Sequence, residues 1–372
     1  MDATTINLRH TPLAEWHRAH GAKLVGFAGW EMPVMYSGIV EEHMAVRERA
    51  GLFDVSHMGR LDVRGAGAEA FLQRVLTNDL ARIAPGQGQY TLALNEAGGV
   101  LDDLIVFRRA DGYLVVMNAG NREKIMGHFR AHADGASVEL VDRSADLAMI
   151  ALQGLKAPAL LAALTPATAA LPRSAMAEFA IAGETMLVSR TGYTGEDGFE
   201  LYPPSARAVA VWDALLAAGK GLPAVSCGLG ARDGLRLEAG YSLYGHEIDE
   251  ETSPWEAGLG WAVRPEKGNF IGREALLELK AKGPRKQQVA FTCAGPGIPR
   301  KDQALTDGNQ EVGIVVSGTF SPCLKLGIGI GYVRGGGEVP AGLGVVVRGR
   351  ALPVVRSKLP FYRSPGLAGG HP

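Results

Sequence analysis

The stretch Gly98-Gly99-Val100-Leu101-Asp102-Asp103-Leu104-Ile105-Val106-Phe107 decides how the middle of this chain folds. Its branched and aromatic residues follow a glycine pair, and they predict a β-strand that starts from a turn. Side chains alternate along a strand, so Asp102 and Asp103 are expected on opposite faces. Each carboxylate therefore interrupts an apolar stripe, where an unpaired charge is costly to bury.

Two interpretations of this acid pair are open. In the first, the acids lie close to a turn and reach solvent at the edge of a sheet. In the second, each acid has a bonding partner or a chemical role that compensates for its burial. The strand by itself favours neither interpretation.

The segments around the acid pair predict an antiparallel meander. Strand patterns cover residues 89–94, 100–107 and 113–117, and glycine-containing turns separate them. Asn118 follows the third strand directly, and its side chain either faces the site or serves the turn.

Length and composition limit the class of protein. A chain of 372 residues predicts two or three domains. Its 50 glycines indicate many tight turns and a strand-rich architecture with helices added. The formal net charge of -1 argues against a nucleic-acid partner bound by bulk electrostatics.

The chain is expected to be cytoplasmic, with no membrane partner. We expect no secretory signal, and no stretch approaches the roughly 20 apolar residues of a membrane helix. Its three cysteines, Cys227, Cys293 and Cys323, are widely spaced, which suits a reducing compartment. No pair of them has zinc-ligand spacing, so no metal is expected.

Polar residues outside the meander are further candidates. Glu200 lies on a predicted strand and either faces a pocket or is an exposed strand acid. Arg232 lies on a predicted helix over residues 228–240, where it binds an anion or a carbonyl, or pairs with a neighbouring acid. His57 has no nucleophile or metal partner nearby in the sequence, which favours a structural histidine over a catalytic one. Short strands in residues 287–363 predict a small β-barrel or sandwich.

Several long motifs, taken in order, resemble the aminomethyltransferase family, the T-proteins of the glycine cleavage system. The resemblance is collinear from about residue 11 to residue 363, and the ordered set is far more specific than any one motif. The motifs are Phe27-Ala28-Gly29-Trp30-Glu31-Met32-Pro33, Phe53-Asp54-Val55-Ser56-His57-Met58-Gly59, Gly98-Gly99-Val100-Leu101-Asp102-Asp103-Leu104, Ser189-Arg190-Thr191-Gly192-Tyr193-Thr194-Gly195-Glu196-Asp197-Gly198-Phe199-Glu200, Gly230-Ala231-Arg232-Asp233 and Pro360-Phe361-Tyr362-Arg363.

The resemblance implies a reaction and a fold. Family members take the aminomethyl group from the lipoyl arm of the H-protein and pass its carbon to the co-substrate tetrahydrofolate. The products are 5,10-methylenetetrahydrofolate, ammonia and dihydrolipoyl H-protein. The implied fold class is α+β, a three-domain cloverleaf of two interleaved α+β domains and a C-terminal β-barrel around a central folate channel. Residues 1–283 would form the folate-binding region, with its second domain centred on about 55–140, and residues 284–372 the barrel.

The resemblance also implies roles for single residues. Asp103 matches the family's key acid beside the folate nitrogens, where a carboxylate can shuttle a proton and stabilise developing positive charge. Glu200 matches the acid that binds two N–H donors of the pterin, and Arg232 matches an arginine of the folate site. Aromatic residues of the same cleft match Tyr90, Tyr193, Tyr241 and Trp261. A basic residue near the folate or the lipoyl entry matches Arg363, and an amide near the incoming lipoyl arm matches Asn118.

Other proteins with this fold are the alternatives. A tetrahydrofolate-dependent O- or S-demethylase would share the folate site, although the full-length motif match favours the glycine cleavage enzyme. A non-catalytic folate-binding protein of iron–sulfur assembly would carry a Lys-Gly-Cys-type motif, and none of the three cysteines stands in one. A flavin-dependent oxidase would add a flavin domain, for which this chain has no room. Phe107 departs from a tyrosine that some relatives carry, which removes a hydroxyl contact and keeps the ring.

Overall fold

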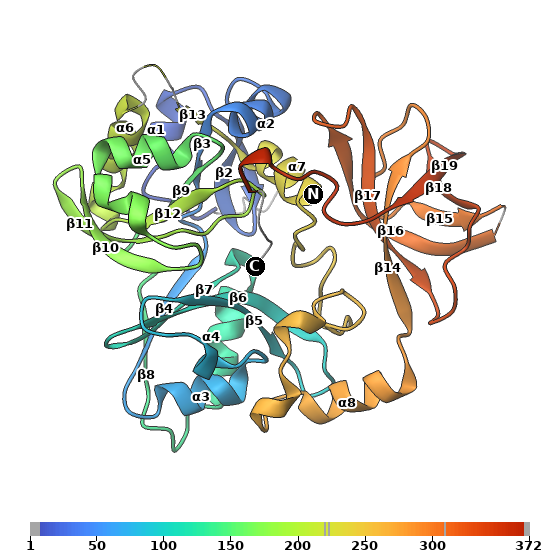
Figure 1. The fold of residues 1–372 in the computed structure, drawn as a ribbon, viewed down its shortest axis with the longest axis horizontal. Helices are drawn as coiled ribbons and strands as arrows, with labels where there is room; N and C mark the ends of the chain where they lie inside the picture. Colours follow the sequence, from blue (N-terminus) through green and yellow to red (C-terminus); the bar gives the residue numbers. More distant parts are fainter. Residues whose placement is uncertain (1–7, 219–220, 222–223, 309, 368–372) are drawn as a thin grey trace, which may run out of the picture. The chain divides into compact units, whose positions relative to one another are not determined.

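The computed structural model describes residues 8–218, 221, 224–308 and 310–367 (Figure 1). The chain divides into two compact units. Unit 1 comprises Met1–Leu61, Val141–Asp233 and Ser364–Pro372, and unit 2 comprises Asp62–Leu140 and Gly234–Arg363. Three of the four boundaries between the units fall within an element, namely β4 (Gly59–Arg64), β8 (Glu139–Asp142) and α7 (Leu229–Glu238). The fourth boundary lies between Arg363 and Ser364.

Unit 1 is built on a six-stranded sheet in the order β10-β11-β12-β9-β3-β13. Strand β13 is parallel to β3, and the other neighbouring strands are antiparallel. The strands are β3 (Ala50–Asp54), β9 (Ile150–Gln153), β10 (Met176–Ile181), β11 (Glu184–Ser189), β12 (Gly198–Tyr202) and β13 (Ala224–Ser226).

Apolar residues of this sheet pack against three helices to form the core of unit 1. The helices are α1 (Ala14–Ala19), α5 (Ala157–Leu164) and α6 (Ala208–Ala218). Trp212 of α6 is fully buried beside Leu52, Ile150 and Phe199 of the sheet. Burial of such large side chains is the main stabilising contribution, about 1.5–3 kcal/mol for each.

A hairpin and a further helix complete unit 1. The hairpin joins β1 (Lys23–Phe27) to β2 (Trp30–Met35), and α2 (Ile39–Glu48) follows. Ala28 and Gly29 form the turn with φ angles of 49° and 78°, in the left-handed region that such tight turns require.

The sheet that carries the acid pair has five strands in the order β5-β6-β7-β4-β8. Strands β5 (Gly88–Leu94), β6 (Val100–Arg109) and β7 (Gly112–Met117) pair antiparallel, as the predicted meander requires. Strand β6 has a neighbour on each side, so the interpretation of Asp102 and Asp103 as edge acids is wrong. Alternation along one strand says which face a side chain takes, whereas the partners on either side depend on the whole sheet.

Two helices belong to this part of unit 2, namely α3 (Ala68–Val75) and α4 (Arg122–Ala131). Phe71 of α3 and Phe129 of α4 meet edge to face, with 5.6 Å between ring centroids. Both rings are buried, and both helices present their apolar residues to the protein interior.

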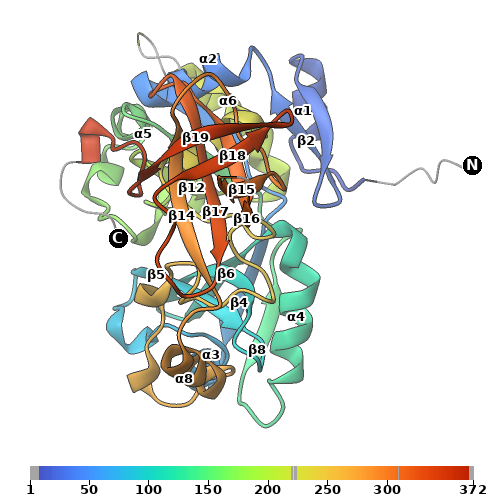
Figure 2. The ribbon, with the colours of Figure 1, turned by 90° about the vertical axis from the view of Figure 1, so that its right-hand side faces the viewer.

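Six further strands of unit 2 close into a barrel in the order β14-β17-β16-β15-β18-β19 (Figure 2). Phe291, Val315 and Val345 lie in its apolar core. Helix α8 (Arg273–Lys282) precedes the barrel, whose strands are β14 (Lys286–Cys293), β15 (Ala304–Asp307), β16 (Gln310–Ser321), β17 (Leu326–Arg334), β18 (Leu343–Val347) and β19 (Arg350–Ser357).

The mixed sheets and helices together with the closed barrel confirm the α+β class and the predicted C-terminal barrel. The division into three domains remains a prediction. Within the described ranges, every helix is too short or too polar to cross a lipid bilayer. Cys227, Cys293 and Cys323 are not joined in disulfides among the described residues, and the first two are buried.

Candidate active site

Asp102 is fully buried on β6 and is bonded to the connection between β7 and α4. Its Oδ2 accepts the backbone N–H of Asn118 at 3.0 Å. Its Oδ1 accepts two side-chain amides, Asn118 Nδ2 at 2.8 Å and Asn121 Nδ2 at 2.6 Å. Asp102 therefore has the partners that its burial demands, and it fastens the 3₁₀ turn Ala119–Asn121 to the sheet.

Asp103 lies on the other face of β6 and is only half-buried. Its Oδ1 accepts Asn118 Nδ2 at 2.6 Å, and its Oδ2 accepts the hydroxyl of Tyr90 at 3.2 Å. The amide of Asn118 thus donates to both carboxyl groups. The side chain of Asn118 therefore faces the two acids.

Burial raises the pKa of both carboxyl groups above the ordinary range of aspartate. The charge of Asp103 adds to the rise in the pKa of Asp102, and the charge of Glu247 adds to the rise in the pKa of Asp103. Hydrogen bonds from Asn118 oppose the rise at both acids. A raised pKa is what a group needs if it is to give up and regain a proton near neutral pH.

Tyr90 links Asp103 to an exposed aromatic surface. Its ring stacks on Trp261, with 5.2 Å between centroids and 28° between planes. Trp261 is 47% exposed, which is unusual for so large an apolar side chain. A flat ligand can stack on such a surface beside the acid pair.

Two further predicted site residues belong to unit 2. Tyr241 is half-buried directly after α7, where its backbone N–H donates to the carbonyl of Arg236 at 2.9 Å. Arg363 is exposed at the end of unit 2, and within the described residues no hydrogen bond or ion pair joins it to the acid pair. The structure therefore brings together Asp103, Asn118, Tyr90 and Trp261.

Glu200 is buried on β12 of unit 1, so the interpretation as an exposed strand acid is wrong. Its Oε2 accepts the hydroxyl of Thr191 at 2.5 Å, and Thr191 is in turn 2.6 Å from Ser189 Oγ. Burial raises the pKa of Glu200, while the Thr191 hydrogen bond and the charge of Arg232 lower it. Glu200 is thus a buried acid whose carboxylate is supported by a neutral donor and a nearby cation.

Arg232 of α7 lies over the ring of Tyr193, with 4.6 Å from its guanidinium carbon to the ring centroid. Its Nη1 is a buried donor with no hydrogen-bond partner among the described residues. An arginine in this state is suited to donate a hydrogen bond to a ligand. Glu200, Arg232 and Tyr193 therefore form a second contact group, within unit 1.

His57 is buried near this second group. Burial is the largest cause that lowers the pKa of His57 to about 4, and the charges of Arg232 and Arg60 add to it. The imidazole is therefore neutral at physiological pH. Its Nδ1 has no partner among the described residues.

Two contact residues were not predicted from the sequence. Asn121 bonds Asp102, and Thr191 bonds Glu200. A role for Asn121 could have been inferred from its position, because Asn118 and Asn121 lie close to the predicted start of a helix. Asparagine side chains commonly form hydrogen bonds at a helix terminus. Thr191 carried no signal of its own beyond its place within one of the long motifs.

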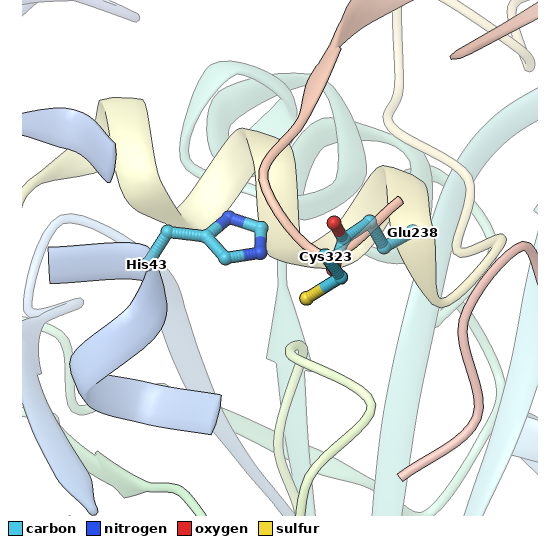
Figure 3. A group of neighbouring side chains, drawn as sticks. All are labelled: His43, Glu238 and Cys323. Atoms are coloured by element: carbon cyan, nitrogen blue, oxygen red, sulfur yellow. The ribbon is translucent and has the colours of Figure 1, made fainter. Parts of the chain in front are cut away.

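Glu238 and Cys323 of unit 2 are two neighbouring residues with metal-binding atoms (Figure 3). A carboxylate oxygen of Glu238 and the sulfur of Cys323 lie within 4.8 Å of each other. The same carboxylate accepts the hydroxyl of Ser321. Structural zinc sites use four ligands, so this pair alone does not define a metal site.

Comparison with known proteins agrees with these features. The family model described as the GCVT N-terminal domain matches residues 13–267, and the glycine cleavage T-protein C-terminal barrel domain matches residues 286–363. An aminomethyltransferase of Rubrobacter xylanophilus is 49% identical, over 96% of this chain and 95% of its own. An aminomethyltransferase of Geobacillus kaustophilus is 47% identical, over 96% and 99%.

A solved structure is similar over almost the whole chain. It is the crystal structure of the glycine cleavage system aminomethyltransferase T from Bartonella henselae. The TM-score is 0.89 with 36% sequence identity, over 96% of this chain and 99% of that one. With both family models and these relatives in agreement, the chain belongs to the glycine cleavage T-protein family of aminomethyltransferases.

Proposed function

We propose that this chain moves the one-carbon unit of an aminomethyl group from the lipoyl arm of a glycine cleavage H-protein to tetrahydrofolate. The products are 5,10-methylenetetrahydrofolate, ammonia and dihydrolipoyl H-protein. The single observation that carries the proposal is the half-buried Asp103, bonded to Tyr90 and Asn118 beside an exposed aromatic surface, in a chain of this family.

The proposed reaction needs two proton movements. Two folate nitrogens each lose a proton as they bond to the carbon, while the amine leaves as ammonia and the lipoyl sulfur becomes a thiol. The carbon keeps its oxidation level, so no redox cofactor is needed. Asp103 is the proposed catalytic residue, because a carboxyl group with a raised pKa can give one proton and take up another.

The surroundings of Asp103 suit this role. Tyr90 and Asn118 each donate to a different oxygen of the carboxyl group, which fixes its orientation. A fixed, half-buried carboxylate also stabilises the positive charge that develops on the transferred carbon. Tyr90, Trp261 and Tyr241 are the proposed aromatic contacts of the flat folate rings.

Glu200 and Arg232 are the proposed pterin-binding residues. A carboxylate accepts two adjacent N–H donors, which is the pattern that a pterin presents, and Arg232 has an unpartnered buried donor. Tyr193 lies under the guanidinium of Arg232 and holds it in place. Arg363 is proposed to bind the anionic part of the folate or the lipoyl entry, and Asn118 to lie near the arm.

The proposal extends to partners and to location. We infer that the lipoylated H-protein and tetrahydrofolate are its partners in the cytoplasm, with the barrel as a separate third domain. Incubation with aminomethylated H-protein and tetrahydrofolate should release ammonia and form methylenetetrahydrofolate at equal rates. Activity should persist with a chelator present, because no step requires a metal. Ammonia release that does not depend on folate would refute the assignment.

A further inference from the structure

Asp102 and Asp103 have different hydrogen-bond partners, and this difference indicates which of the two carboxyl groups can hold a proton. Asp102 accepts three N–H donors, which are Asn118 N, Asn118 Nδ2 and Asn121 Nδ2. None of these groups can accept a hydrogen bond, because amide nitrogens only donate. A protonated Asp102 would therefore lose one of these bonds and leave its own O–H without an acceptor, which is costly in a fully buried position.

Asp103 has a different partner on one of its oxygens. Its Oδ1 faces the amide of Asn118, but its Oδ2 faces the hydroxyl of Tyr90 at 3.2 Å. A hydroxyl both donates and accepts, so Tyr90 can turn its hydrogen away and accept from a protonated Oδ2. The Oδ2 of Asp103 thus keeps a hydrogen-bond partner in both protonation states.

Two carboxylates that share the amide of Asn118 repel each other when both are ionised. The pair therefore holds one proton more readily than an isolated carboxyl group does. Burial and the charge of Asp103 raise the pKa of Asp102, but its three N–H donors oppose that rise and would leave a proton on Asp102 without an acceptor. We propose that Asp102 stays ionised and, by its charge and its hold on Asn118, places the retained proton on Asp103. Asp102 is a positioning residue in this scheme, since it is fully buried and acts through Asp103 and Asn118.

Other titratable groups face the pair and are part of its electrostatic balance. Glu247, from the segment after α7, adds negative charge and is itself paired with Arg236 at 2.9 Å. The charge of Asp102 adds to the rise in the pKa of Tyr244, which lies in the same segment. The hydroxyl of Tyr244 accepts a hydrogen bond from Lys124 of α4 at 2.7 Å. Tyr90 of β5 is the remaining titratable contact. The negative charge of Glu247 favours a protonated Asp103. The three N–H groups bonded to Asp102 cannot pass a proton from Asp102 to a neighbouring acid, because they only donate hydrogen bonds.

The consequence for the reaction rests on the proposed function. An Asp103 that starts protonated gives this proton to a departing group, and the resulting carboxylate takes up the proton that a folate nitrogen loses. One proton leaves and one returns, so the acid is regenerated in each turnover. Protonation before the reaction also removes a negative charge from the half-buried site.

Carbon-13 NMR of the aspartate carboxyl carbons tests the proton's place without any reaction. The wild-type chain is labelled, and the two resonances are assigned from their backbone neighbours, so no variant has to fold. We expect the Asp103 resonance to titrate across the neutral range while the Asp102 resonance stays at its ionised position. Titration of Asp102 alone, or equal movement of both resonances, would overturn the inference.

A second measurement uses the pH profile of turnover. Asp102→Asn removes the charge, so the pKa of Asp103 should fall and the alkaline limb of the kcat profile should move to lower pH by about one unit or more. Asp111→Asn is the matched control, since Asp111 is exposed in the turn after β6, and it should leave the limb in place. An unshifted limb in Asp102→Asn would refute the electrostatic part of the proposal. Absence of transfer in the wild type would refute the proposed function instead and leave the NMR result standing.

Discussion

The ring of Tyr90 stacks on Trp261 at 5.2 Å, and the hydroxyl of the same tyrosine donates to Asp103 Oδ2 at 3.2 Å. One side chain therefore joins an exposed aromatic surface to a buried acid pair. The ring can contact a flat ligand, while the hydroxyl orients the acid. The two functions of Tyr90 can be separated by substitution.

Tyr90→Phe should lower kcat by about tenfold, because one hydrogen bond to a charged or protonated carboxyl group contributes about 1.5–3 kcal/mol. Folate affinity should change little, since the stacked ring remains. Tyr90→Ala should in addition weaken folate binding. Steady-state kinetics and calorimetric titration with tetrahydrofolate separate the two effects. Equal kcat in Tyr90→Phe and wild type would contradict the orienting role.

Glu200→Gln should weaken tetrahydrofolate binding by about 10- to 100-fold, because a charge-assisted pair of hydrogen bonds is replaced by a neutral and incomplete one. The value of kcat at saturating folate should stay within a few-fold of wild type. Calorimetry gives the affinity. Glu178→Gln is the control, since Glu178 is exposed on β10 of the same sheet. A large loss of kcat with unchanged affinity would show that Glu200 acts on the reaction and not on binding.

Asp103→Asn should abolish transfer but make the chain more stable at and above neutral pH. The pKa of both acids is raised in the folded chain, so the folded chain binds more protons than the unfolded one and loses stability as pH rises. Without the Asp103 carboxyl group, this pH-dependent loss of the free energy of unfolding, on the order of 2 kcal/mol, no longer occurs. Denaturant unfolding at a series of pH values should show a gain that shrinks toward pH 4. A gain of constant size would contradict this explanation.

His57 should make the folded chain sensitive to acid. Burial lowers the pKa of His57 to about 4, whereas an unfolded chain has the ordinary value of 6.5. Between these values only the unfolded chain binds the proton, so stability falls as pH drops through this window, by about 3 kcal/mol in all. His57→Gln should lose less stability than wild type between pH 7 and pH 4.5. His10→Gln, at an exposed position, should behave as wild type.

Arg236→Met should destabilise unit 2 by about 3–5 kcal/mol, because it leaves Glu247 buried without its cation. The two groups lie 2.9 Å apart with 1% of each side chain exposed, and Arg236 also donates to Ser317 of the barrel at 2.7 Å. Guanidinium-induced unfolding measures the loss. Arg334→Met, which breaks an exposed pair with Glu311, should cost at most about 1 kcal/mol. A similar cost for both variants would contradict the importance of burial.

The sequence was informative where local pattern and chain order carry the signal. The alternation of the 100–107 stretch predicted that Asp102 and Asp103 occupy opposite faces, and the structure has one fully buried and the other half-buried. The short strands of residues 287–363 predicted a small barrel or sandwich, and β14–β19 form a closed barrel. Long motifs in order predicted the family, because a collinear series of such stretches rarely arises by chance.

The partners of those residues were decided by tertiary structure alone. The sequence left open whether the acids lay at an edge, whether Asn118 faced the site or served the turn, and whether Glu200 was exposed. Hydrogen bonds such as those of Asn121 to Asp102 and of Thr191 to Glu200 depend on register and on which turn packs beside which strand. A pattern along one strand determines the direction of a side chain, whereas its burial and its pKa depend on groups brought close only by the folded chain.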